Sequence, residues 1–230
     1  MIDSSPPPFQ GFKPSATRFF KDLAVNQNKA WFNAHKAEYE QHVKAPLGAL
    51  VLAVTERLAP SNLPLIGDPK RSLFRIHRDV RFSIDKSPYK TNASAVLSVN
   101  GSKTAQGLIY FQLGADETFV AAGFYMPMPN DLKLLRVGMV QDPEGWLSVR
   151  KGLKKQGLAL MTEGALVRLP KGFESAPTAV HDDLRLKSWA VSKRIPLAMA
   201  RSPELVNAIA WLALSCADLL EFGWTSLEAA

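Results

Sequence analysis

The sequence predicts an α+β domain built on one antiparallel sheet. Four candidate strands follow one another between residues 74 and 125, with short links and no helical pattern between them. Helical patterns lie before and after this region. Strands joined by short links pair antiparallel, because a parallel pair needs a long crossover connection. We therefore expect a single domain with a sheet of about four to six strands, packed by N-terminal and C-terminal helices.

Helices are expected ahead of the sheet. Ser15 can cap a first helix, and Asn28 can cap a longer one whose apolar side chains recur at helical spacing as far as Leu58. Pro46 lies inside the second pattern. Because proline lacks an N–H and its ring clashes with the preceding turn, the helix must kink there or a new helix must begin.

The stretch richest in chemically active groups is residues 71–92. Apolar and charged side chains alternate in it from Phe74 to Phe82, with Arg78 as the exception. This alternation predicts a strand with one apolar and one charged face. Residues 83–92 are too polar for a strand and contain Pro88, so they predict an ordered loop. The side chains of the run that can bind a charged ligand are Arg75, His77, Arg78, Asp79, Arg81, Asp85, Lys86, Tyr89 and Lys90.

Turn residues separate the remaining strands, because Asn100-Gly101 and Gly114-Ala115-Asp116 are typical hairpin connections. Asp142, followed by Pro143, is expected to begin a helix after the sheet. The other expected elements are strands at 94–99, 108–113 and 118–125, a helix at 130–140, short strands at 157–161 and 165–169, a short helix at 182–186, a strand at 188–195 and a final helix opened by Ser202 and Pro203.

The composition is that of a globular protein, since 47% of the 230 residues are hydrophobic and 21% are charged. Residues 1–14 contain four prolines and predict an extended arm ahead of a single domain over residues 15–230. Cys216 is the only cysteine, so no intramolecular disulfide forms. The sequence has no cluster of His, Cys, Asp and Glu at metal-ligand spacing, and we expect neither a metal nor a cofactor.

Hydropathy and charge indicate which kinds of partner the sequence favours. The start of the chain lacks a basic segment followed by an apolar one, and no run of about 18 apolar residues occurs, so we expect a cytoplasmic protein with no membrane partner. The formal net charge is +7, and residues 70–90 hold seven basic and two acidic side chains, a difference of +5. This concentration of charge favours an anionic partner. The sequence indicates no oligomeric state.

Three functions suit the charged run. Arginine and lysine side chains bind phosphate and carboxylate groups, so the first is binding of a small anionic or phosphorylated ligand. The second is an enzyme of unknown reaction in which Asp79, His77 or Asp85 transfers protons. The third is a structural ion network with no ligand, because alternating signs also suit internal salt bridges. Nucleic acid is not favoured as a partner, although Tyr110 or Tyr125 could stack a base beside the run.

Four segments are distinctive in their order along the chain: NQNKAWF at Asn26–Phe32, FRIHRDVRFSIDKSPYKT at Phe74–Thr91, GFYMP at Gly123–Pro127 and LPKGF at Leu169–Phe173. In order and spacing they resemble the bacterial and fungal family of conserved hypothetical proteins called domain of unknown function 2461. The sequence departs from that family at Gln27, where a second asparagine is usual, and near Ala176, where a histidine usually precedes the proline. The resemblance implies no established activity, and it supports residues 74–91 as the location of the site.

Overall fold

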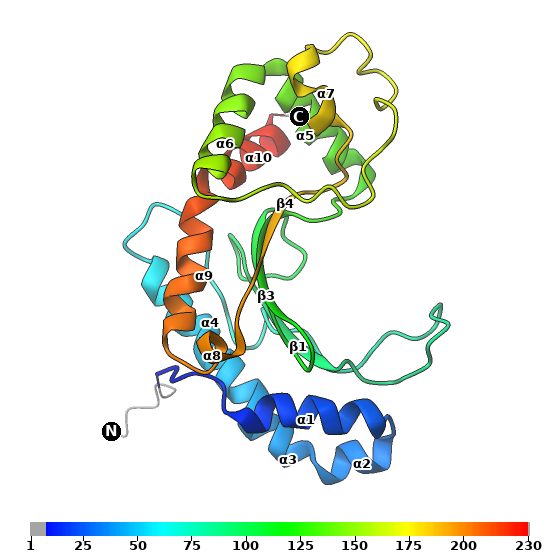
Figure 1. The fold of residues 1–230 in the computed structure, drawn as a ribbon, viewed down its shortest axis with the longest axis vertical. Helices are drawn as coiled ribbons and strands as arrows, with labels where there is room; N and C mark the ends of the chain where they lie inside the picture. The colour runs from blue at the N-terminus through cyan, green and yellow to red at the C-terminus, as the bar shows by residue number, and fades with distance from the viewer. Residues whose placement is uncertain (1–7, 230) are drawn as a thin grey trace. The chain divides into compact units, whose positions relative to one another are not determined.

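The structure, a computed structural model, describes residues 8–229. An open sheet of four strands runs through it in the order β1-β2-β3-β4, and neighbouring strands are antiparallel (Figure 1). The predicted α+β fold class is therefore confirmed, and each strand lies within two residues of its predicted range. The strands are β1 (Asn92–Leu97), β2 (Leu108–Gly114), β3 (Thr118–Phe124) and β4 (Trp189–Arg194).

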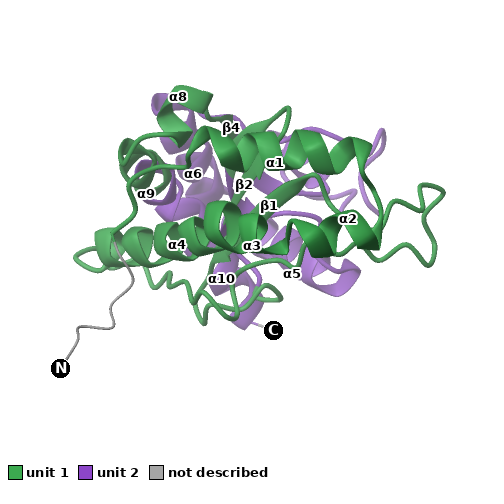
Figure 2. Cartoon of the chain, turned by 90° about the horizontal axis from the view of Figure 1, so that it is seen from below, with its two compact units in different colours: residues 1–105, 110–120, 193–210 green, residues 106–109, 121–192, 211–230 purple. Residues whose placement is uncertain are grey.

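Contacts within the chain divide it into two compact units, which Figure 2 shows in green and purple. Strand β1 belongs to unit 1, whereas β2, β3 and β4 contribute residues to both units. Unit 1 comprises residues 1–105, 110–120 and 193–210, and unit 2 comprises residues 106–109, 121–192 and 211–230.

The predicted N-terminal arm is described only from residue 8 onward, and residues 1–7 lie outside the described residues. Phe9 and Phe12 of the arm are buried in unit 1. The Phe12 N–H donates to the carbonyl oxygen of Ala200 at 2.9 Å. The boundary between arm and domain at residue 15 stays a prediction.

The helices of unit 1 begin close to the predicted positions. Asn28 caps α2 as expected, because its Oδ1 accepts a hydrogen bond from the Trp31 N–H at 2.9 Å. The prediction that Ser15 caps α1 is wrong, because α1 begins one residue earlier, at Pro14, whose fixed φ suits the first helical turn. These helices are α1 (Pro14–Val25), α2 (Lys29–Ala34), α3 (Lys36–Tyr39), α4 (Ala45–Leu58) and α8 (Leu197–Ala200).

Pro46 begins a second helix. Residues 40–44 form a π-helical segment, η1 (Glu40–Lys44), and α4 starts directly after it, so that Pro46 lies in the first turn of α4. The backbone is already helical before Pro46, since the Ala45 N–H donates to the carbonyl oxygen of Glu40 in the π-helical pattern, so the wider π-helical turn lies directly ahead of the proline. Helix α4 in turn contacts β1 (Figure 1).

The two faces of β2 differ in burial. Ile109 and Phe111 are buried, and Phe12 stacks on Phe111 with the ring centroids 6.0 Å apart. Tyr110 and Gln112 are only half-buried. Because side chains alternate along a strand, one face of β2 is buried and the other remains partly open to solvent.

The strand predicted from Phe74 to Phe82 is wrong. The segment bends at Ile76 and again at Arg81 and Phe82, and its bridges are isolated antiparallel ones, at Leu73 just before it and at His77. A strand needs a hydrogen-bonded neighbour along its length, and alternation of side chains does not by itself supply one. Within the described chain, residues 79–87 bridge no strand.

The apolar side of this segment is buried only near the sheet. Ile76 is buried as the predicted pattern requires, whereas Phe82 and Ile84 are 96% and 102% exposed. These two side chains lie in the part of the loop that bridges no strand. Alternation therefore did not predict which apolar side chains of this stretch are covered, because that depends on what packs against them.

Unit 2 contains a helical layer formed by α5, α6 and α10, which contact one another. Asp142 caps α6 as expected, because its Oδ1 accepts from the Gly145 N–H at 2.9 Å. The predicted helix at 130–140 is confirmed as α5, and the predicted short helix at 182–186 appears as α7. The elements are α5 (Pro129–Gln141), α6 (Pro143–Lys155), η2 (Thr178–Val180), α7 (His181–Leu184) and α10 (Ala217–Glu228).

Two predictions for the C-terminal half are wrong. The segments 157–161 and 165–169 form no strand, although the Met161 N–H donates to the carbonyl oxygen of Ala190 at 2.8 Å and the Leu166 N–H donates to that of Arg185 at 2.8 Å. The expected single final helix is broken at Cys216 into α9 (Glu204–Ser215) and α10.

No single helix of the described residues is long and apolar enough to span a bilayer, and α9 and α10 reach that length and composition only when counted together across their bend.

Candidate functional site

Backbone hydrogen bonds place the charged run beside the open face of the sheet. The Phe74 N–H donates to the carbonyl oxygen of Ser94 in β1 at 2.9 Å, which keeps the start of the run alongside that strand. Farther on, the Arg78 N–H donates to the carbonyl oxygen of Pro88 at 2.9 Å, so the run folds back on itself. The two ends of the run therefore meet at the edge of β1.

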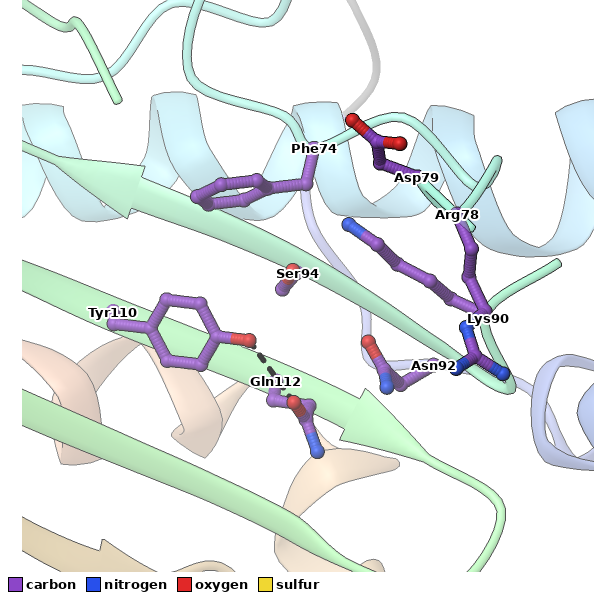
Figure 3. A pocket seen from close by; sticks show the side chains of 8 residues that line it. All are labelled: Phe74, Arg78, Asp79, Lys90, Asn92, Ser94, Tyr110 and Gln112. Atoms are coloured by element: carbon purple, nitrogen blue, oxygen red, sulfur yellow. Dashed lines mark hydrogen bonds between the residues drawn. The ribbon is translucent and has the colours of Figure 1, made fainter. Parts of the chain in front are cut away.

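A cleft of about 410 Å³ lies where the run meets β1 and β2 (Figure 3), and we call it the sheet cleft. Its lining combines positive charge, aromatic rings and uncharged polar groups, all within unit 1. The lining residues are Phe74, Arg78, Asp79, Lys90, Asn92, Ser94, Tyr110 and Gln112.

Lys90 supplies a half-buried positive charge to the sheet cleft. Its ammonium lies 5.3 Å from the centroid of the Phe74 ring. Burial lowers the pKa of Lys90, and the positive charge of Arg75 lowers it further. None of the ion pairs formed within the described residues includes Lys90, so no carboxylate offsets these two effects by pairing with its ammonium.

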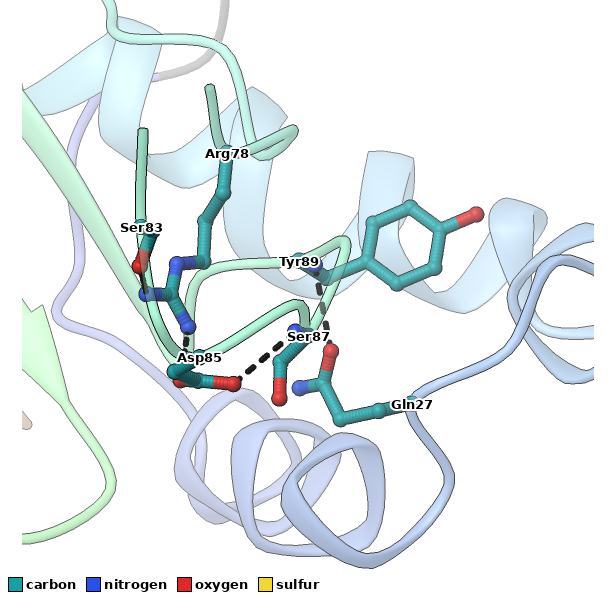
Figure 4. Close-up of polar contacts among 6 residues, drawn as sticks. All are labelled: Gln27, Arg78, Ser83, Asp85, Ser87 and Tyr89. Atoms are coloured by element: carbon teal, nitrogen blue, oxygen red, sulfur yellow. Dashed lines mark hydrogen bonds and ion pairs between the residues drawn. The ribbon is translucent and has the colours of Figure 1, made fainter. Parts of the chain in front are cut away.

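Arg78 links the sheet cleft to a second hollow of about 360 Å³. Its guanidinium forms an ion pair with Asp85 and lies 3.4 Å from the Ser83 hydroxyl (Figure 4). Asp85 also accepts from the Ser87 N–H at 2.9 Å, and hydrogen bonds from Ser87 and Arg78 lower the pKa of Asp85. The second hollow is lined by Ala24, Gln27, Arg78, Asp85, Ser87, Tyr89, Lys90, Thr91 and Asn92.

Gln27 anchors the returning half of the run. Its Oε1 accepts a hydrogen bond from the Tyr89 N–H at 3.1 Å (Figure 4). The Tyr89 ring is buried and stacks on Phe32 with the centroids 4.5 Å apart. The backbone at Tyr89 is thus held between an amide and an aromatic core, which fixes the position of the neighbouring Lys90.

Asp79 and Arg81 bind each other on the rim of the sheet cleft. The Arg81 Nε and Nη2 atoms donate to the two carboxylate oxygens of Asp79 at 3.0 and 2.7 Å. These hydrogen bonds lower the pKa of Asp79. Lys86 points elsewhere, because its Nζ donates to the carbonyl oxygen of Val80 at 3.0 Å.

The two remaining predicted residues, His77 and Arg75, do not line the sheet cleft. The His77 ring packs near Phe32 and Tyr89, at centroid distances of 5.9 and 5.2 Å. Arg75 is exposed and acts on Lys90 and Asp79 through its charge. Of the nine predicted residues, the structure brings Arg78, Asp79 and Lys90 together in the sheet cleft.

The predicted set omitted the cleft residues that lie on the strands. Ser94 of β1 and Tyr110 and Gln112 of β2 line the cleft but carry no charge. The spacing of Tyr110 and Gln112, two residues apart between buried neighbours, is the signal that two polar side chains share one open face of a strand. No group of three or more His, Cys, Asp and Glu side chains within residues 8–229 is placed to hold a metal ion.

These features define an α+β protein whose open sheet carries a cleft of mixed cationic and aromatic lining. The chain belongs to the family described as conserved hypothetical protein, domain of unknown function 2461, whose model matches residues 15–222. The match covers the whole charged run and all four strands. No curated protein and no solved structure matches the chain.

Proposed function

We propose that the protein binds a small anionic ligand in the sheet cleft, with Lys90 and Arg78 as the groups that hold the anion. The observation that carries this proposal is the state of Lys90. A half-buried ammonium whose pKa is lowered by burial and by the charge of Arg75 is stabilised by an anion placed beside it. Phosphate and carboxylate groups are the anions that lysine and arginine side chains bind in proteins.

The other charges of the run support a site with fewer anion-binding residues than the sequence predicts. Arg81 and Asp79 pair with each other, so their two charges offset each other. Arg78 keeps Asp85 as a partner, but its planar guanidinium carries five N–H donors, enough for a carboxylate and a further anion. The ion pairs of the loop fit the structural ion network expected as one alternative. Lys90 takes part in neither of these two pairs.

Proton transfer by Asp79 receives no support from the contacts of this site. The hydrogen bonds from Arg81 lower the pKa of Asp79, which suits a permanently charged carboxylate better than a group that exchanges protons near neutral pH. The His77 ring lies against Phe32 and Tyr89 rather than against a carboxylate. A small anion therefore suits the cleft better than an acid–base reaction by these groups.

Calorimetric titration with ribose 5-phosphate, a simple phosphorylated probe, tests the proposal. We expect Lys90→Met to weaken binding at least about tenfold, because a hydrogen bond to a charged group contributes about 1.5–3 kcal/mol. Lys86→Met is the matched control, since it removes the same charge from the same run but outside the cleft. It should change the affinity by less than about threefold.

Two results would overturn the proposal. One is a lack of binding by the unaltered protein, and the other is an equal loss in Lys86→Met and Lys90→Met. Thermal unfolding of both variants checks that the fold is retained. Lys90→Met is expected to keep it, because it removes a charge whose burial is unfavourable.

A further inference from the structure

We infer that the ligand of the sheet cleft carries two separate anionic groups, as a sugar bisphosphate does. This inference rests on the proposed function and adds a second anion to the one held by Lys90 and Arg78. It is carried by Lys103, a second half-buried lysine beside the same aromatic ring. The ammonium groups of Lys90 and Lys103 lie 5.3 and 5.9 Å from the centroid of the Phe74 ring, toward which Figure 3 shows the Lys90 side chain reaching.

Main-chain carbonyl groups hold Lys103 beside Phe74. Its Nζ donates to the carbonyl oxygens of Arg71 and Leu73, the latter at 3.1 Å. These acceptors orient the ammonium but carry no net charge, so they do not neutralise it. A lysine ammonium has three N–H donors, and one of them therefore remains for a ligand. Lys103 does not itself line the sheet cleft, but its position beside Phe74 places its charge at the border of the cleft.

The two ammonium groups lack a paired carboxylate within the described chain. None of the ion pairs formed by residues 8–229 includes Lys90 or Lys103. Burial lowers the pKa of Lys90 and the charge of Arg75 lowers it further, so Arg75 adds a third positive charge nearby. Asp79, which lines the cleft, is paired with Arg81. An anion beside Lys90 alone would therefore leave Lys103 without a counter-charge.

One small molecule can serve both lysines, because both ammonium groups lie beside one ring of the cleft lining. The cleft volume of about 410 Å³ lies within the range of sites that take a small organic molecule. The lining also offers uncharged hydrogen-bonding groups on Asn92, Ser94 and Gln112, which suit the hydroxyl groups of a sugar. Two anionic groups joined by a polar linker thus match the cleft and its border better than a single phosphate.

The test compares fructose 1,6-bisphosphate with fructose 6-phosphate, which lacks the second phosphate, by calorimetry on the full chain. We expect the bisphosphate to bind at least about tenfold more tightly, which is the effect of one further hydrogen bond between charged groups. Lys103→Gln should abolish this gain while leaving the affinity for fructose 6-phosphate within about threefold. Its amide can still donate to the carbonyl oxygens of Arg71 and Leu73. Lys103→Arg, which keeps the charge, should retain most of the gain.

Lys86→Gln is the matched control, because Lys86 also donates to a main-chain carbonyl oxygen, that of Val80, but does not line the sheet cleft. It should leave the gain unchanged in about 0.15 M salt, which screens the field of the net charge.

Three results would overturn the inference while leaving the proposed function intact. The first is a bisphosphate that binds no more tightly than the monophosphate to the unaltered protein, and the second is a gain that survives in Lys103→Gln. The third is a loss of the same size for both probes in Lys103→Gln, because Lys103 would then act only by holding Phe74 in place. Failure of both probes and of ribose 5-phosphate to bind would overturn the proposed function as well.

Discussion

At the scale of single residues, the site depends on the contrast between Lys90 and its charged neighbours. Arg78, Arg81, Asp79 and Asp85 satisfy one another in ion pairs close to the surface. Such exposed pairs contribute little to stability, and their effect is to hold the loop in shape. Lys90 is the cation of this region that burial and a like charge disfavour, so it gains most from a bound anion.

The affinity for ribose 5-phosphate should fall as the pH rises toward the ordinary lysine pKa of about 10.4, because the pKa of Lys90 is lowered below it. The pKa of Lys90 is lowered in the free protein, and a bound anion raises it, because the anion favours the charged form. Lys90 therefore contributes fully to the affinity while its side chain is protonated in the free protein. This contribution is lost as the pH rises through the lowered pKa of Lys90. Calorimetric titrations across this range measure it.

Lys90→Arg provides the control, because a guanidinium stays charged over the whole range. Its affinity should be nearly independent of pH. A fall of the same size in Lys90→Arg would show that another group titrates, and would contradict the role given to Lys90.

At the scale of secondary structure elements, the charged run behaves as a loop anchored at one end. Near β1 it is held by backbone bonds, whereas Phe82 lies in the stretch that bridges no strand and is 96% exposed. Phe111 of β2 shows the opposite situation, since it is buried and stacks on Phe12. The two phenylalanines therefore differ in what they contribute to folding.

Phe82→Ala should change the free energy of unfolding by less than about 0.5 kcal/mol, as is usual for an exposed side chain. Phe111→Ala makes the same chemical change in the core and should cost about 3–5 kcal/mol. Urea unfolding followed by circular dichroism measures both. A large loss of stability in Phe82→Ala would mean that the loop is covered in solution.

Strands β3 and β4 approach each other closely at Gly123. Its φ is +122°, and a Cβ at this position would lie 2.1 Å from the carbonyl oxygen of Trp189. Gly123→Ala should therefore destabilise the protein by more than about 3 kcal/mol. Gly172→Ala is the matched control, since its φ is +87° but no atom lies within 4 Å of the new Cβ. It should cost only about 1–2 kcal/mol in urea unfolding.

At the scale of the whole molecule, the net charge of +7 attracts any anion, and this general attraction must be distinguished from binding in the cleft. Salt screens exposed charges over about 10 Å at 0.1 M, but it screens half-buried contacts much less. Raising the ionic strength should therefore weaken the attraction that arises from the net charge, while the contribution of contacts in the cleft to the affinity remains.

Raising the salt from about 0.05 M to about 0.5 M should remove the small difference between Lys86→Met and the unaltered protein, because that difference arises from the general field. The tenfold or larger loss in Lys90→Met should persist. Titrations of ribose 5-phosphate at the two salt concentrations measure this. Disappearance of the Lys90→Met effect at high salt would contradict a direct contact.

Much of the fold could be predicted because local patterns fixed it. Turn residues between runs of strand-forming residues located the strands of the sheet, and the caps at Asn28 and Asp142 located two helix starts. The failures occurred where local pattern and tertiary partner disagree. Phe74 to Phe82 alternates like a strand but has no neighbouring strand along its length, and α1 begins at Pro14, one residue before the predicted cap Ser15.

By itself, the sequence determined the fold class, the family and the stretch of chain where positive charge gathers, because these depend on local spacing and composition. Only the tertiary structure decided which charges neutralise one another and which one faces a cleft. The ion pairs of Arg81 with Asp79 and of Arg78 with Asp85 join residues close in the chain, but the burial of Lys90 depends on residues farther away, such as Tyr110 in the sheet cleft. The spacing of residues within the run does not encode that burial, and it did not predict that Ser94 and Gln112 of the strands line the cleft.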